Sequence, residues 1–116
     1  MLATLRFIAI GLPNVTEGSH PGGLDFRVGG RVFAAIADAD RASAILHLGS
    51  EAQFRFCALD PYLFAPAPDA GGHGTTRVQL NGIDEEALRS ALEAAWRHVS
   101  GATMAPTRRA GVPVAA

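Results

Sequence analysis

The sequence predicts a two-layer α+β sandwich, in which an N-terminal and a C-terminal helix cover one face of a five-stranded antiparallel sheet. Apolar residues recur at helical spacing at both ends of the folded region, and between them they alternate with polar residues. Short turns rich in glycine, asparagine or proline separate the alternating runs. Amphipathic helices and a half-apolar sheet bury their apolar sides against each other. The expected element order is αβββαββα.

The size and composition of the chain allow one small domain. Its 116 residues are 48% hydrophobic and 18% charged, which argues against disorder over most of the length. We expect a single domain over residues 1–100 and a flexible tail over residues 101–116, where no apolar period remains. No apolar run approaches the roughly 18 residues of a membrane span. Without an export signal, we expect a cytoplasmic protein with no membrane partner.

The N-terminal segment predicts one helix and an irregular link. Leu5 and Ile8 belong to an apolar stripe on a helix over residues 2–11, which Gly11 helps to end. The following residues 14–23 contain proline and glycine and few apolar side chains. They predict a surface connector without regular structure.

A meander of three strands should follow. Two alternating runs joined by glycines 29–30 predict a hairpin over residues 24–37, because both turn positions can take a positive φ. Residues 38–41 are the next turn, and alternation over residues 43–48 predicts the third strand.

A second helix and a fourth strand are expected in the middle of the chain. Ser50 and Gln53 match a capping box, in which each side chain bonds a free backbone N–H of the other residue. The helix they begin ends near residue 59, and the apolar residues 62–65 predict the fourth strand. Residues 66–74 form a loop with little internal structure.

The C-terminal elements have the strongest signals. Residues 75–80 alternate as a fifth strand, and the terminal helix begins after Asp84, a good cap, and ends near Gly101. The helix carries one continuous apolar stripe and two acid-base pairs at the favourable spacing of four residues. The pairs are Glu85–Arg89 and Glu93–Arg97.

Several of these segments resemble the MmcQ/YjbR family of small bacterial proteins. The resemblance is carried by residues 11–18, by His20-Pro21, by residues 26–33 and by residues 77–80, and it covers the chain from residue 2 to about residue 100. It implies a fold like that of the bacterial frataxin CyaY. It also implies a DNA-binding role, the label that the family commonly carries.

The sequence departs from the family pattern before the fifth strand. Many relatives place a tryptophan there, often beside a basic residue or a histidine, whereas this chain has Gly74-Thr75-Thr76-Arg77 after His73. The aromatic platform on which a base could stack is therefore missing.

Residues on the polar face of the sheet are the candidates for nucleic-acid contact. The alternation places Arg27, His47, Arg77 and Gln79 there, and the hairpin turn adds Arg31. Arginine forms bidentate hydrogen bonds with phosphate. The DNA-binding role itself is what the resemblance implies, and these residues add limited support to it. We expect the binding to be weak, because the formal net charge of −1 gives no general attraction to a polyanion. The alternative is that these arginines are solvated or paired with acids such as Asp25.

The sequence predicts neither a metal site nor an enzyme. Cys57 lies between apolar neighbours in the second helix, which favours a buried structural thiol. No nucleophile motif or phosphate loop is present. The histidines lack the spacing of a zinc site, and the first helix has no acid that would hold a hard cation. The histidines are His20, His47, His73 and His98. We expect no cofactor.

A second function class is a module that binds a protein or a small ligand and has no nucleic-acid role. The strand alternation can place Phe33 and Ile45 on the polar face, opposite in direction to Val32 and Leu46. Apolar groups on an open sheet favour pairing with another copy of the chain. A homodimer is therefore a further expectation, although burial of both residues under a neighbouring element is equally compatible with the pattern.

Overall fold

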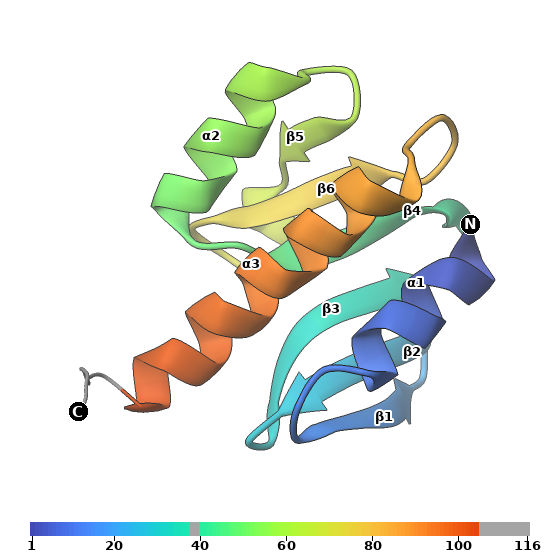
Figure 1. Ribbon diagram of the computed structural model, residues 1–116, viewed down its shortest axis with the longest axis vertical. Helices are drawn as coiled ribbons and strands as arrows, with labels where there is room; N and C mark the ends of the chain where they lie inside the picture. Colours follow the sequence, from blue (N-terminus) through green and yellow to red (C-terminus); the bar gives the residue numbers. More distant parts are fainter. Residues whose placement is uncertain (38–39, 105–116) are drawn as a thin grey trace.

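The computed structural model describes residues 1–37 and 40–104. Within them, three α-helices lie on one side of a single antiparallel sheet of six strands in the order β1-β2-β3-β4-β6-β5 (Figure 1). The strands are β1 (Val15–His20), β2 (Gly23–Val28), β3 (Arg31–Ala37), β4 (Asp40–His47), β5 (Phe64–Pro66) and β6 (Thr75–Gln79). The helices are α1 (Leu2–Ile10), α2 (Ser50–Leu59) and α3 (Glu85–Met104), with a short 3₁₀ turn, η1 (Pro68–Ala70). The α+β class is as predicted.

Strand β1 corrects the sequence prediction, which expected five strands and an irregular connector over residues 14–23. β1 pairs with β2 along its whole length, with Val15 opposite Val28. As an edge strand it has one neighbour, and its side chains do not alternate between buried and exposed. It therefore lacks the period-two pattern that identifies a strand. Its one signal is the turn dipeptide Pro21-Gly22, which links β1 and β2 as a hairpin.

The hairpin of β2 and β3 forms as predicted. Gly29 and Gly30 have φ of 61° and 79°, a left-handed turn conformation that side chains with a Cβ rarely adopt. The third predicted strand is longer than expected, because β4 already begins at Asp40, within the segment predicted as a turn. The rest of that turn, residues 38–39, lies outside the described residues.

A bulge in β3 moves Phe33 to the core. Phe26 pairs with Ala34 and Arg27 pairs with Val32, so Phe33 is an extra residue between two paired positions. Its side chain is fully buried in the core cluster. The expectation that Phe33 lies on the polar face of the sheet is therefore wrong, since strict alternation does not continue through a bulge.

The start of α2 does not use the predicted capping box. Gly49 is the N-cap, with φ of 84°, and no side chain caps the helix. Ser50 is the first helical residue rather than the cap. The Gln53 amide instead donates to the Thr75 carbonyl oxygen at 2.9 Å and to Thr76 Oγ1 at 3.1 Å. This side chain links α2 to β6, a tertiary contact that the local motif does not reveal.

The segment after α2 is shifted from its predicted boundaries. The strand expected over residues 62–65 is β5, which begins two residues later, while Tyr62 lies exposed. The carboxylate of Asp60 accepts the backbone N–H groups of Tyr62 and Leu63, and this turn delays the strand. The predicted loop over residues 66–74 contains η1.

Helix α3 begins as predicted and ends later than predicted. The Ala87 N–H donates to Asp84 Oδ1 at 2.7 Å, which confirms the cap. Both predicted ion pairs form, Arg89–Glu85 at 3.1 Å and Arg97–Glu93 at 3.6 Å. The helix passes through Gly101, because glycine without a left-handed φ is tolerated in a helix at a cost of about 1 kcal/mol. The predicted tail from residue 105 onward lies outside the described residues.

The core lies between the helices and one face of the sheet. Leu88 and Leu92 of α3 are fully buried together with Phe26 and Leu46 of the sheet. Figure 1 shows α3 running across the strands, with α1 beside it over β1 and β2. In the described chain all three helices lie on this side, so no described helix covers the opposite face of the sheet.

Glycines in the loop before β6 give a test of this packing. Gly72 and Gly74 both have a left-handed φ, but a Cβ at Gly74 would lie 2.6 Å from the Gly49 Cα, whereas a Cβ at Gly72 would meet nothing. We expect Gly72→Ala to lower the free energy of unfolding by about 1 kcal/mol. Gly74→Ala should cost at least about 2 kcal/mol more, because backbone cannot move aside as a side chain can.

Urea denaturation of the two variants and the wild type measures both effects. Gly72→Ala is the matched control, because it carries the same strain in φ without the steric conflict. Equal losses of stability in the two variants would contradict the close approach of the two loops.

Candidate nucleic-acid interface

The face of the sheet opposite the helices, here called the outer face, receives every second side chain of the strands. Residues paired across strands point to the same face. Ile45 of β4 lies opposite Arg77 of β6, and Ser43 lies opposite Gln79. The predicted contact residues on the outer face are Arg27, His47, Arg77 and Gln79. Arg31 lies opposite the buried Val28 after the β2–β3 turn, which places it at the end of the sheet on the helix-covered side.

Asp25 is a buried carboxylate on the outer face, and it holds Arg27. Arg27 donates through Nε to Asp25 Oδ1 at 2.9 Å and through Nη2 to Oδ2 at 3.2 Å. His20 Nδ1 lies 3.1 Å from Oδ2. Gly18, opposite Asp25 on β1, leaves room for the carboxylate, since a Cβ there would lie 2.7 Å from Oδ1.

The charges of this cluster balance internally. The hydrogen bond from Arg27 lowers the pKa of Asp25 below its ordinary value, against the opposing effect of burial, and His20 adds to the lowering. The same contact raises the pKa of Arg27. Arg27 is thus paired with Asp25 and positioned by it. This agrees with the alternative prediction that arginines of this face pair with acids.

Arg77 and Gln79 differ in how far they reach into solvent. Arg77 is exposed near the middle of β6, between Ile45 of β4 and Ala65 of β5. Gln79 is half-buried beside Ser43. Arg77 makes no ion pair with a residue that the structure describes, so its guanidinium keeps its donors for a ligand.

His47 and Arg31 meet at the end of β4. Both line a cavity of about 180 Å³, and Arg31, like Arg77, pairs with no acid in the described part of the chain. His47 is half-buried, with Nδ1 3.4 Å from Thr75 Oγ1. Burial lowers the pKa of His47, and repulsion from a positive charge on His98 lowers it further. The imidazole is therefore neutral at pH 7 unless an anion approaches.

Among the residues whose side chains the structure describes, the acids are concentrated away from the outer face. Glu17 points toward α1, where Oε1 accepts the Arg6 Nε–H at 2.7 Å. The acids of α2, α3 and their caps are Glu51, Asp60, Asp84, Glu85, Glu86 and Glu93. Among the described residues Asp69 of η1 is exposed, and Asp25 is neutralised by Arg27. Most of the described acids thus lie in the helical layer, where Arg6, Arg55, Arg89 and Arg97 also lie, while the outer face carries few acids.

Sequence reasoning did not find two residues of the cavity at the end of β4. His73 enters it from the loop before β6, and His98 enters it from α3. The sequence predicted no site that these two histidines share. Nothing in the local pattern brings His98 to His47, because the crossing of α3 over the sheet determines that contact.

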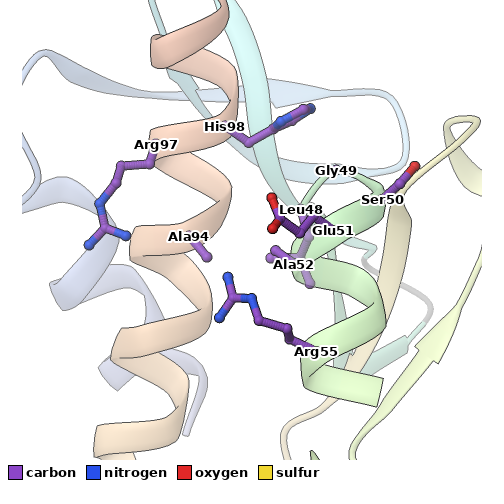
Figure 2. A pocket seen from close by; sticks show the side chains of 9 residues that line it. All are labelled: Leu48, Gly49, Ser50, Glu51, Ala52, Arg55, Ala94, Arg97 and His98. Atoms are coloured by element: carbon purple, nitrogen blue, oxygen red, sulfur yellow. The ribbon is translucent and has the colours of Figure 1, made fainter. Parts of the chain in front are cut away.

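A larger cavity of about 460 Å³ separates α2 from α3. Figure 2 shows Glu51 and Arg55 of α2 directed toward the gap, with Ala94 of α3 facing them. Arg97 also lines this cavity and extends away from α2 in the same view. The lining carries both signs of charge, so it does not attract a polyanion.

The described residues offer no cluster for metal or thiol chemistry. No group of three or more histidine, cysteine, aspartate or glutamate side chains within them is placed to hold a metal ion. Cys57 is partly buried against the core, and burial raises the pKa of its thiol. The thiol is protonated at neutral pH and a weak nucleophile.

No helix in residues 1–37 and 40–104 combines the length and apolar character needed to cross a membrane.

Comparison with known proteins gives one family and one similar fold. The YjbR family model matches residues 10–98. The crystal structure of the Deinococcus radiodurans protein DR2400, which carries the family-model domain DUF419, is 22% identical in sequence. The match covers 86% of this chain and 78% of that chain, with a TM-score of 0.72. At this identity the likeness shows the fold alone. No curated protein matches the sequence.

The Asp25 cluster should stabilise the fold in a pH-dependent way. Because the pKa of Asp25 is lowered in the folded state, its stabilising effect is present above the ordinary value of 3.8 and is lost as the pH falls through the folded value. We expect Asp25→Asn to lower the free energy of unfolding at pH 7 by about 1–3 kcal/mol.

Urea denaturation at neutral and acidic pH measures this difference. The gap between wild type and Asp25→Asn should close at low pH, where the wild-type carboxyl is also protonated. Arg6→Gln removes the exposed Arg6–Glu17 pair and should cost less than about 1 kcal/mol. A gap that persists in acid would contradict a role of the Asp25 charge.

Proposed function

The chain belongs to the YjbR family, as its motifs predicted, and we propose that it binds the phosphate backbone of DNA weakly through the outer face of its sheet. The supporting observation is that most acids with described side chains lie on the helices and their caps and not on the outer face. Arg31 and Arg77 pair with no described acid, and Asp25, the buried acid of the outer face, is already neutralised by Arg27. Phosphate is the ligand that suits such guanidinium groups.

The geometry favours contact with phosphates rather than with bases. The outer face has no exposed aromatic ring in the described residues, because Phe7, Phe54 and Tyr62 lie on α1, on α2 and in the turn after α2. Base stacking on aromatic rings is the usual means of binding single strands. Binding through arginine alone is insensitive to sequence and to strandedness.

The small number of free arginines sets the expected strength. Arg31 and Arg77, with His47 when it is protonated, would neutralise two or three phosphates. For duplex DNA the logarithm of the affinity then falls with the logarithm of salt concentration at a slope of about −1.8 to −2.7. Between about 50 and 200 mM salt the affinity should drop roughly ten- to fortyfold.

Fluorescence anisotropy with a labelled duplex and a labelled single strand tests the proposal. Arg77→Ala should weaken binding to every sequence and reduce the magnitude of the salt slope by about 1. Arg89→Ala is the matched control, because it removes the same charge from α3 on the other side of the molecule. Absence of binding at the lower salt concentration, or equal effects of the two substitutions, would overturn the proposal.

Arg27 should behave differently from Arg77. Among the described residues, its removal leaves the buried Asp25 carboxylate with His20 as its side-chain partner. We expect Arg27→Ala to lower the melting temperature by several degrees, a change that Arg77→Ala should not cause. Differential scanning calorimetry of both variants measures this, and equal melting temperatures would contradict the positioning role of Arg27.

The cavity between α2 and α3 supports a second candidate function, the binding of a small ligand that carries both signs of charge. Glu51 and Arg55 are four residues apart and both are directed toward the gap (Figure 2), yet they form no ion pair with each other. Their charges are therefore free to meet an ammonium and a carboxylate group.

A thermal-shift screen with free amino acids tests this alternative. A ligand of the cavity should raise the melting temperature of the wild type and of Arg89→Ala, but not that of Arg55→Ala. If no amino acid shifts the wild-type melting temperature at about 10 mM, the cavity does not have this function.

A further inference from the structure

The cavity at the end of β4 is lined by basic side chains and by no acidic one. Its polar side chains are Arg31, His47, His73 and His98, and it contains no acid. Each of these groups donates hydrogen bonds when protonated. They come from the start of β3, the end of β4, the loop before β6 and helix α3, so the tertiary fold alone assembles them.

Close backbone contacts hold two of the imidazoles in place. A Cβ at Gly49 would lie 2.6 Å from His98 Nδ1, and a Cβ at Gly71 would lie 2.7 Å from His47 Cε1. Each ring therefore packs directly against a glycine. The neighbouring Thr75 hydroxyl lies 3.4 Å from His47 Nδ1 and leaves Nε2 for another partner.

The size of the cavity limits what can enter. At about 180 Å³ it is smaller than the roughly 300–1,000 Å³ pockets that hold drug-sized ligands. A single ion or one terminal group of a larger molecule fits this volume. A cation is disfavoured by Arg31, and the described side chains present no group of three ligands that could hold a metal ion.

We propose that this cavity binds one tetrahedral oxyanion of the phosphate-monoester class, held by the Arg31 guanidinium and by the imidazoles of His47 and His98, with His73 closing its exposed side. The inference rests on the proposed function for its ligand, because His47 lies on the outer face and the cavity that it shares with Arg31 lies at that end of the sheet. The terminal phosphate of a strand is the monoester that this position would receive.

The proposal requires binding to become tighter as the pH falls. His47 is kept neutral by burial and by repulsion from His98, and the groups that face it are Arg31, His73, His98 and the Thr75 hydroxyl. A bound dianion reverses the repulsion and favours protonation of the ring. By linkage, protonation favours the dianion. Glu51 and Arg97 line the neighbouring cavity beyond His98 and do not line this one.

Sulfate is the probe for the first experiment, because it keeps two negative charges throughout the range in which histidine titrates. Nuclear magnetic resonance of the imidazole protons follows all four histidines at once. We expect saturable shifts at His47, His73 and His98 and none at His20, which bonds to Asp25 outside the cavity. The affinity should be several times higher at about pH 5.5 than at about pH 7.5, because the bound dianion favours the protonated form of the His47 ring.

Two substitutions make the result specific. Arg31 is exposed, so Arg31→Ala should leave the melting temperature unchanged and weaken sulfate binding by about tenfold or more. Arg89→Ala should leave the affinity for sulfate unchanged, since it lies on α3 away from the cavity. Equal shifts at all four histidines, or an Arg31→Ala variant with wild-type affinity, would overturn the proposal.

A second arm distinguishes a strand terminus from free phosphate as the source. Oligonucleotides that carry a terminal phosphate should bind several times more tightly than the same strands with a terminal hydroxyl, and Arg31→Ala should remove this difference. If only inorganic phosphate or sulfate binds, the site is for a free oxyanion and the link to DNA fails. If strands bind without any preference and sulfate does not, the proposed DNA-binding function survives and this cavity has no part in it.

Discussion

The packing of the α3 apolar stripe on the middle of the sheet is the contact on which the rest of the structure depends. Leu88 and Leu92 bury the inner face of β2, β3 and β4, and with α1 and α2 on the same side they leave the outer face open. The Trp96 indole donates to the Pro13 carbonyl oxygen at 3.0 Å and ties α3 to the link between α1 and β1. Since α3 also supplies His98, the same packing completes the cavity at the end of β4.

Because the helices cover only one face of the sheet, the two faces differ in the charged side chains that they carry. Helix termini and solvent-facing helical positions accommodate acids well, and most of the described acids lie there. Strands β2 and β6 direct Arg27 and Arg77 to the other face, where Asp25 balances Arg27 and leaves Arg77 without a described ion pair. The proposed contact of this face with phosphate therefore does not require a positive total charge, and the chain has a formal net charge of −1. Local placement matters more than the total charge because screening limits the reach of distant acids to about 10 Å.

The sites themselves were only partly predictable. The alternation of β2 and β6 correctly indicated which face Arg27 and Arg77 occupy, because the period of two is a local property of a strand. It did not reveal that Arg27 is engaged by Asp25, since a hydrogen bond between side chains on one face depends on burial and on the room that Gly18 leaves on the neighbouring strand. Phe33 was misplaced because a bulge is a property of a pair of strands and not of one strand.

The sequence by itself determined the α+β class, the order of the strongly patterned elements and the family, because apolar periodicity and short motifs act over a few residues. Only the tertiary structure decided the sixth strand, the start of α2 and the assembly of the histidine cavity. β1 is stabilised by pairing with β2, Gln53 is drawn to β6, and His98 reaches His47 because α3 crosses the sheet. Each depends on a partner distant in sequence, and such a partner leaves no local pattern.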